Sequence, residues 1–278
     1  MKKFAMVFPG QGSQTVGMLA ELAGDYPIVQ ETFKQASEVL GYDLWQLVQE
    51  GPAEELNKTW QTQPALLTAS VAVYRVWQQK YPELKPEVMA GHSLGEYSAL
   101  VCAGVLDFQD AIKLVELRGN AMQQAVPAGT GAMFAIIGLE NEAIIKACEQ
   151  AASETGEIVS AVNFNSPGQV VIAGTKTAAT RAGELCKEAG AKRALPLAVS
   201  VPSHCALMKP AADKLAEALQ NITLNQPLVP VINNVDVATE TDADKIRDAL
   251  VRQLYSPVRW TETVEKMAKD GVHKENKT

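Results

Sequence analysis

Cysteine is scarce in this 278-residue chain, and its four copies lie far apart. Cys102, Cys148, Cys186 and Cys205 form none of the closely spaced pairs that are typical of zinc sites and dithiol redox motifs. Scarce, unpaired cysteines favour a reducing compartment. We therefore expect a cytoplasmic protein without a metal site, and no motif indicates an organic cofactor.

Long apolar runs and excess positive charge are also missing. No stretch reaches the roughly 18 apolar residues of a membrane-spanning helix. The apolar run 4–8 is broken by Pro9-Gly10, too early for a secretory signal. With 25 Lys and Arg against 32 Asp and Glu, the net charge of -7 opposes binding to phosphate backbones and anionic lipid. We expect an unprocessed protein with no membrane and no nucleic-acid partner.

The composition itself, 47% hydrophobic and 21% charged, is that of a globular protein with one large or two modest domains. Residues 4–8 and 88–90 are predicted strands, and each runs into a glycine-containing turn. Helical patterns surround them, at 26–81 with Pro64 opening a long helix, at 94–105 and at 111–126. Beyond residue 200 we expect a helix at 203–219, a strand at 229–235 and two helices ending near Asp270.

The middle of the chain has a different order of predicted strands and helices. Strands are predicted at 133–137, 158–164, 169–173 and 192–199, with helices at 141–152 and 177–189. This β-α-β-β-α-β order is that of a ferredoxin-like unit. The fold class is therefore α/β: a hydrolase-like body with a parallel sheet flanked by helices (1–127 and 201–278) and an inserted ferredoxin-like subdomain (128–200).

Gly91-His92-Ser93-Leu94-Gly95 is a Gly-x-Ser-x-Gly motif at a predicted strand-to-helix turn. Glycines allow the sharp bend that exposes such a serine at the start of the helix, so Ser93 is the candidate nucleophile. The alternative is an ordinary glycine-rich turn with a capping serine.

A serine nucleophile needs a base, and the chain offers three histidines. His273 lies in a charged tail, and the side chain of His92 should diverge from its neighbour Ser93. His204 remains, after a predicted strand (194–201) that would bring it to the same sheet edge as Ser93. Alternatively, His204 only caps or packs at the start of a helix. Since no acid lies nearby in sequence, the group that orients His204 is distant or a backbone carbonyl.

Two further features suggest a binding site. The Gly10-Gln11-Gly12 loop follows a strand, so the backbone N–H of Gln11 could form an oxyanion hole with that of Leu94; a plain tight turn is the alternative. The loop is no dinucleotide fingerprint, because Thr15 stands at the third glycine position. Arg118 lies on an apolar helix face, so it needs an anion, either a protein carboxylate or a substrate's. The alternative without a binding function is a snorkelling side chain, which extends along the apolar surface and keeps its charge in water.

At this point the sequence resembles the malonyl-CoA:acyl carrier protein transacylase family of type II fatty acid synthesis. The motifs that carry the resemblance follow in family order over about residues 4–272. They are Phe8-Pro9-Gly10-Gln11-Gly12-Ser13-Gln14, Gln63-Pro64-Ala65, Gly91-His92-Ser93-Leu94-Gly95-Glu96-Tyr97, Arg118-Gly119, Asn163-Phe164-Asn165-Ser166-Pro167-Gly168-Gln169, Pro202-Ser203-His204 and Pro257-Val258-Arg259-Trp260.

The resemblance implies an acyltransferase that moves a malonyl group from malonyl-CoA to the phosphopantetheine thiol of acyl carrier protein through a malonyl-serine. It implies a Ser93–His204 dyad, an oxyanion hole from Gln11 and Leu94, and Arg118 on the malonyl carboxylate. The supporting residues that it implies are Gln63 in the pocket, His92, Asn163, and Gln253, whose main-chain carbonyl would orient His204.

The resemblance also suggests partners and one departure. Acyl carrier proteins are acidic, so we expect a locally basic docking surface, with Lys192 and Arg193 as candidate residues. We also expect the protein to be a monomer. Relatives continue after the last helix with a strand, a Gly-Pro-Gly turn and another helix, whereas here residues 273–278 are charged and polar. We expect this to uncover a sheet edge and to affect stability rather than catalysis.

Two rival interpretations remain. A serine hydrolase of the α/β-hydrolase type shares the Ser93 motif but expects a His-Gly-Gly-Gly-like loop and an acid between serine and histidine. A catalytically dead scaffold that binds carrier protein would not be acylated by malonyl-CoA at all.

Overall fold

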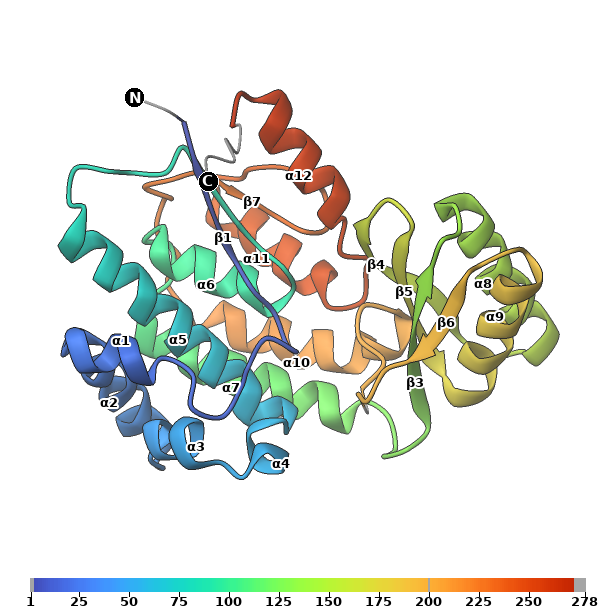
Figure 1. Ribbon diagram of the computed structural model, residues 1–278, viewed down its shortest axis with the longest axis horizontal. Helices are drawn as coiled ribbons and strands as arrows, with labels where there is room; N and C mark the ends of the chain where they lie inside the picture. Colours follow the sequence, from blue (N-terminus) through green and yellow to red (C-terminus); the bar gives the residue numbers. More distant parts are fainter. Residues whose placement is uncertain (1–2, 200, 273–278) are drawn as a thin grey trace.

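The computed structural model describes residues 3–199 and 201–272, which form two sheets with separate helical layers (Figure 1). The first sheet is parallel, with the order β1-β2-β7. Its strands are β1 (Ala5–Phe8), β2 (Val88–Gly91) and β7 (Val231–Ile232). Parallel strands need covered faces. Helix α6 (Leu94–Cys102) packs against all three of them, so the strand-turn-helix unit around Ser93 is at the centre of this body.

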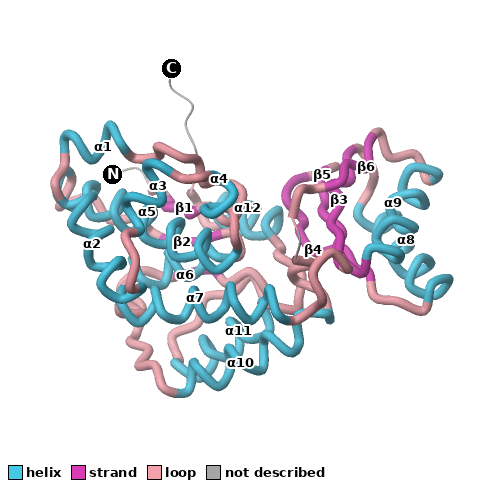
Figure 2. Tube along the Cα trace, turned by 90° about the horizontal axis from the view of Figure 1, so that it is seen from below, coloured by secondary structure: helices cyan, strands magenta, loops and turns pink. Residues whose placement is uncertain are grey.

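Layers of helices surround the first sheet (Figure 2). The long helix α5 (Thr59–Lys80) is largely buried because it lies between α6, α2 (Ile28–Leu40) and α7 (Phe108–Gln124). The other elements of the body are α1 (Ala20–Asp25), α3 (Leu44–Glu50), α4 (Ala53–Leu56), a 3₁₀ turn (Ala206–Met208), α10 (Lys209–Gln220), α11 (Ala243–Gln253) and α12 (Trp260–Lys269). One continuous apolar cluster connects most of them.

The second sheet is antiparallel, with the order β4-β5-β3-β6. Its strands are β3 (Gly131–Ile137), β4 (Val159–Ser166), β5 (Gln169–Thr175) and β6 (Arg193–Pro196), and α8 (Asn141–Thr155) and α9 (Lys176–Glu188) cover one face (Figure 2). Renumbered from its first strand, this order is 2-3-1-4, which is the ferredoxin-like arrangement. The expected fold class is confirmed.

The opposite face of the second sheet contacts the body next to His204. Met133, Val162, Val171 and Ala173 pack there around Cys205. Backbone hydrogen bonds add a second junction, because Val258 donates to Val162 O at 2.8 Å and accepts from Phe164 N–H at 3.0 Å. The two units therefore meet where the chain leaves β6 and returns to the body.

Three local predictions were wrong. Pro64 lies in the second turn of α5 rather than at its start, since the helix already begins at Thr59. The strand expected to continue to residue 201 ends at Pro196, because its partner β3 pairs with it only over residues 193–196. The helix expected from Ser203 begins only at Lys209, because His204 has a φ of 62°, which an α-helix does not allow.

No helix in the described part of the chain is long and apolar enough to cross a membrane. The charged end from His273 onward, where the sequence departs from the family pattern, lies outside the described residues.

Candidate active site

Ser93 occupies a sharp turn between β2 and α6. Its backbone has φ 54° and ψ −110°, a conformation that side-chain-bearing residues rarely adopt. The flanking glycines are required by close approach: a Cβ on Gly91 would lie 1.9 Å from the carbonyl of Gly95, and one on Gly95 would lie 2.3 Å from Phe8 O. The motif therefore holds the serine at the head of α6, facing a cleft.

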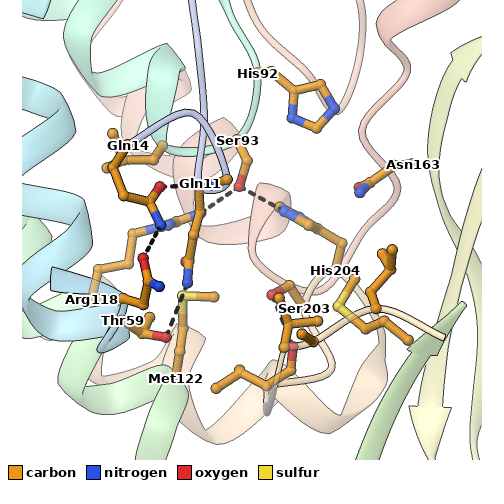
Figure 3. A pocket seen from close by; sticks show the side chains of 18 residues that line it. Gln11, Gln14, Thr59, His92, Ser93, Arg118, Met122, Asn163, Ser203 and His204 are labelled. Atoms are coloured by element: carbon orange, nitrogen blue, oxygen red, sulfur yellow. Dashed lines mark hydrogen bonds between the residues drawn. The ribbon is translucent and has the colours of Figure 1, made fainter. Parts of the chain in front are cut away.

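His204 lies directly beside this serine. Its Nε2 is 2.7 Å from Ser93 Oγ (Figure 3), and its Nδ1 is 2.7 Å from the main-chain oxygen of Gln253. A carbonyl oxygen can only accept, so Nδ1 carries the proton and Nε2 presents its lone pair to the hydroxyl. That tautomer is the one a general base requires. The strand before His204 was predicted to end at the same sheet edge as Ser93, and this was wrong. That strand is β6, which belongs to the antiparallel second sheet and not to the parallel sheet that contains β2.

The imidazole of His204 is held neutral. Burial lowers its pKa from 6.5 to about 3, and the positive charge of Arg118 acts in the same direction. A neutral imidazole can accept a proton across the physiological pH range.

Arg118 places a permanent cation beside the two residues. It is 1% exposed, and its guanidinium donates to Gln63 Oε1 at 2.9 Å, Gln253 Oε1 at 3.1 Å and Ser93 Oγ at 3.3 Å. These acceptors are neutral, Nε has no partner, and within residues 3–199 and 201–272 no carboxylate forms an ion pair with this side chain. Such a charge can be stabilised by an incoming anion.

Gly119 determines how close Arg118 comes to Gln63. A Cβ at this position would lie 2.6 Å from Trp60 Cα and 2.7 Å from Thr59 O, so the glycine lets α7 touch the start of α5. At this close contact, Arg118 on α7 forms its hydrogen bond with Gln63 on α5.

The cleft in front of Ser93 has a volume of about 440 Å³ and is lined from both units (Figure 3). The lining residues are Gln11, Gly12, Gln14, Asn57, Thr59, His92, Ser93, Leu94, Arg118, Met122, Met133, Asn163, Leu197, Ala198, Val199, Val201, Ser203 and His204. Among the described residues, nothing accepts a hydrogen bond from the backbone N–H of Gln11 or of Leu94. Both N–H groups are therefore available to a bound oxygen.

The two other predicted site residues at the cleft are His92 and Asn163. The ring of His92 is engaged away from Ser93: Nε2 lies 2.8 Å from Asn165 Oδ1, and Trp260 packs 5.7 Å away between centroids. Burial lowers the pKa of His92, which keeps this ring neutral as well. Asn163 also lines the cleft, and its Oδ1 is buried without a hydrogen-bond partner in the described structure. Lys192 and Arg193 do not line the cleft; both are exposed at the start of β6.

Sequence reasoning missed Asn234, Glu96 and the side chain of Gln253. Asn234 accepts the N–H of Ser93 at 2.8 Å, and Glu96 accepts that of Asn234 at 2.7 Å. Glu96, fully buried, could have been noticed as an acid among the apolar residues of the Ser93 motif; Asn234 carried no such signal. The acid expected by a hydrolase is replaced by the Gln253 carbonyl, since no carboxylate of the described chain bonds to His204.

Comparisons with known proteins agree with this geometry. Residues 5–274 match the acyl transferase domain family. The chain is 81% identical over 272 residues, 98% of its length, to a malonyl CoA-acyl carrier protein transacylase of Haemophilus influenzae, of which it covers 86%. A crystal structure of an acyl carrier protein S-malonyltransferase from Vibrio cholerae superposes with a TM-score of 0.95 at 73% identity, covering 98% of this chain and 88% of that one. Also at a TM-score of 0.95, with 70% identity and coverage of 98% and 87%, is a malonyl-transacylase in complex with its type II PKS acyl-carrier protein.

Proposed function

This chain belongs to the acyl transferase family, and from that premise we propose that it transfers a malonyl group from malonyl-CoA to the phosphopantetheine thiol of acyl carrier protein. The reaction supplies fatty acid synthesis in the cytoplasm. The observation that carries the proposal is the position of Arg118, a buried cation without a carboxylate partner in the described chain, 3.3 Å from the hydroxyl of Ser93.

In the first half-reaction, Ser93 Oγ attacks the thioester carbonyl while His204 Nε2 takes the hydroxyl proton. The N–H groups of Gln11 and Leu94 donate to the oxyanion of the tetrahedral intermediate. The C–S bond then breaks, and the thiolate of coenzyme A leaves with the proton from His204. The Gln253 carbonyl keeps the imidazole aligned and stabilises its protonated form.

In the second half-reaction, the thiol of the carrier's phosphopantetheine arm replaces coenzyme A. His204 removes the thiol proton, sulfur attacks the malonyl-serine ester, and the proton returns to Ser93 Oγ as the ester bond breaks. The overall reaction is a ping-pong transfer with a covalent intermediate, and it needs no cofactor.

Arg118 selects the acyl group. A bidentate pair with the free carboxylate of the malonyl group adds charge-assisted hydrogen bonds that the neutral acceptors of Arg118 cannot supply, while an acetyl group offers no partner. Gln63 holds the guanidinium in place from α5. Asn163 and His92 form part of the wall of the cleft.

The two structural units have separate roles in this proposal. Residues 1–127 and 201–278 are the acyltransferase body. Residues 128–200 are the ferredoxin-like subdomain, which forms one wall of the cleft. Lys192 and Arg193, exposed on that subdomain, contact the acidic carrier protein, and the enzyme acts as a monomer.

Intact-mass measurement after mixing the protein with malonyl-CoA tests the proposal. We expect a mass increase of one malonyl group, located at Ser93, that disappears when the holo carrier protein is added and reappears on the carrier. Release of free malonate without a thiol acceptor would instead indicate the hydrolase. Absence of any adduct would indicate a scaffold, and Ser93→Ala is the control.

A further inference from the structure

The backbone of Ser93 is held in an unfavourable conformation. Only four non-glycine residues of the described chain have a positive φ, and Ser93 is one of them. Such a conformation persists only where surrounding contacts impose it. Within the turn, Gly95 N–H donates to His92 O and Glu96 N–H donates to Ser93 O, and on the strand side His92 N–H donates to Phe8 O of β1. None of these bonds gives an acceptor to the N–H of Ser93 itself, which needs another support.

The side-chain amide of Asn234 supplies that support. Asn234 follows β7 and is fully buried. Its Oδ1 accepts the N–H of Ser93 at 2.8 Å, and its Nδ2 donates to Gly91 O at 2.7 Å. One planar amide therefore bridges the last residue of β2 and the nucleophile, two residues apart.

Asn234 is itself anchored by its main chain. Its N–H donates to Glu96 Oε1 at 2.7 Å, and its carbonyl accepts from Arg259 N–H at 3.3 Å. Glu96 lies on α6, one turn beyond Ser93, so the serine, the helix that it begins and Asn234 form a closed set of contacts.

Gln253 links this set to the other reacting groups. Its Nε2 donates to Asn234 Oδ1 at 3.2 Å and to Ser93 O at 3.0 Å, while its Oε1 accepts from Arg118 and its main-chain oxygen from His204. Asn234 and Gln253 therefore connect the three reacting groups, the Ser93 hydroxyl, the His204 imidazole and the Arg118 guanidinium, in one hydrogen-bond network.

We propose that Asn234 is a positioning residue of the acyl transfer, which sets the direction of Ser93 Oγ by bridging Ser93 N–H and Gly91 O. The inference rests on the proposed role of Ser93 as nucleophile. Asn234 does not line the cleft, so it acts on the rate of acylation and not on substrate binding. Without the bridge, the turn relaxes and the hydroxyl moves out of line with His204 Nε2 and with the Leu94 N–H.

Single-turnover acylation by malonyl-CoA of the full-length Asn234→Ala variant tests this proposal. We expect the maximal acylation rate to fall about 100-fold, as misplacement of a reacting group by about an ångström can cause. The malonyl-CoA concentration at half-maximal rate should change less than about threefold, because Arg118 and the cleft are intact.

A second probe removes any dependence on Arg118. Phenylmethanesulfonyl fluoride forms a sulfonyl ester with an activated serine: the Ser93 O–S bond forms, the S–F bond breaks, and fluoride leaves with the hydroxyl proton. The labelling rate of the variant should fall by a factor similar to that of the acylation rate.

Asn233→Ala is the matched control. Asn233 is the buried neighbour, and its Oδ1 caps a turn by accepting Asp236 N–H without contacting the Ser93 turn. Its loss should lower the melting temperature while leaving the acylation rate within about threefold. An Asn234→Ala variant that acylates at the wild-type rate, or two variants whose rates fall in parallel with their melting temperatures, would overturn the inference. Failure of the wild-type protein to acylate at Ser93 would instead overturn the proposed function.

Discussion

Ser93 and His204 share a backbone property as well as a hydrogen bond. Their side chains meet at 2.7 Å, and both residues have a positive φ, 54° and 62°. Neither conformation belongs to a regular helix or strand. Each residue therefore lies in an irregular turn, and the hydrogen bond joins two such turns.

Replacement of Arg118 tests how the acyl group is selected. Arg118→Ala should lower kcat/KM for malonyl-CoA by about two or more orders of magnitude while sparing or raising that for acetyl-CoA, because only malonyl pairs with the guanidinium. Arg75→Ala is a suitable control, since Arg75 is a partly buried arginine that bonds to Thr32 and Gln35 on α2. If the ratio of the two substrates were unchanged in Arg118→Ala, another group would hold the carboxylate.

The pH profile of acylation reports on His204. Burial and the charge of Arg118 lower the pKa of this imidazole from 6.5 to about 3, so we expect the imidazole to stay neutral at pH values well below 6.5. We expect the maximal acylation rate, measured by stopped flow, to be flat from about pH 8 to about pH 5. An inflection near about pH 6.5, the value of a free imidazole, would contradict this environment.

Glu96 should make stability depend on pH in the opposite direction to His204. Burial raises the pKa of this carboxyl from 4.5 to about 7, so the folded state binds its proton more tightly than the unfolded state. The stabilisation is complete below about pH 4.5 and is lost as the pH rises through about 7. For His204, with its folded pKa lowered, stability is instead lost as the pH falls below about 6.5.

Comparison of Glu96→Gln with the wild type isolates the Glu96 contribution, because His204 is common to both. The free energy of unfolding of the variant minus that of the wild type should rise by roughly 2 kcal/mol from pH 5 to pH 8. Urea denaturation at a series of pH values measures this difference. A difference that is constant with pH would mean that Glu96 is ionised throughout.

The contact at Gly119 should be intolerant of a single methyl group. Gly119→Ala forces a Cβ against the backbone of Trp60, so we expect destabilisation by about 1–3 kcal/mol and a weaker affinity for malonyl-CoA as Arg118 separates from Gln63. Calorimetry and substrate titration measure the two effects. Gly24→Ala in α1, where a Cβ meets nothing within 4 Å, should be neutral or stabilising. If Gly119→Ala and Gly24→Ala had the same stability and the same affinity for malonyl-CoA, α5 and α7 would be able to move apart enough to accommodate the added methyl group.

Much of the secondary structure could be predicted because it depends on local patterns. The β-α-β-β-α-β order, the strand before Ser93 and α7 around Arg118 all follow from hydrophobic periodicity and turn residues. Errors fell where tertiary contacts override those patterns. The segment after β6 has strand-like residues but loses its partner beyond Pro196, and the chain at His204 adopts a turn where a helix was expected.

The sequence by itself determined which chemical groups are present: a serine in a glycine-flanked turn, a histidine, a cation on an apolar helix face and a glycine loop. These follow from residue types and short spacings. The tertiary structure decided the contacts themselves: the hydroxyl and imidazole meet across 111 positions, the main-chain oxygen of Gln253 lies 2.7 Å from His204 Nδ1, and Asn234 and Glu96 are connected to the Ser93 turn by hydrogen bonds. Those contacts join segments whose separation is set by the packing of two sheets and their helices, and no local pattern encodes such distances.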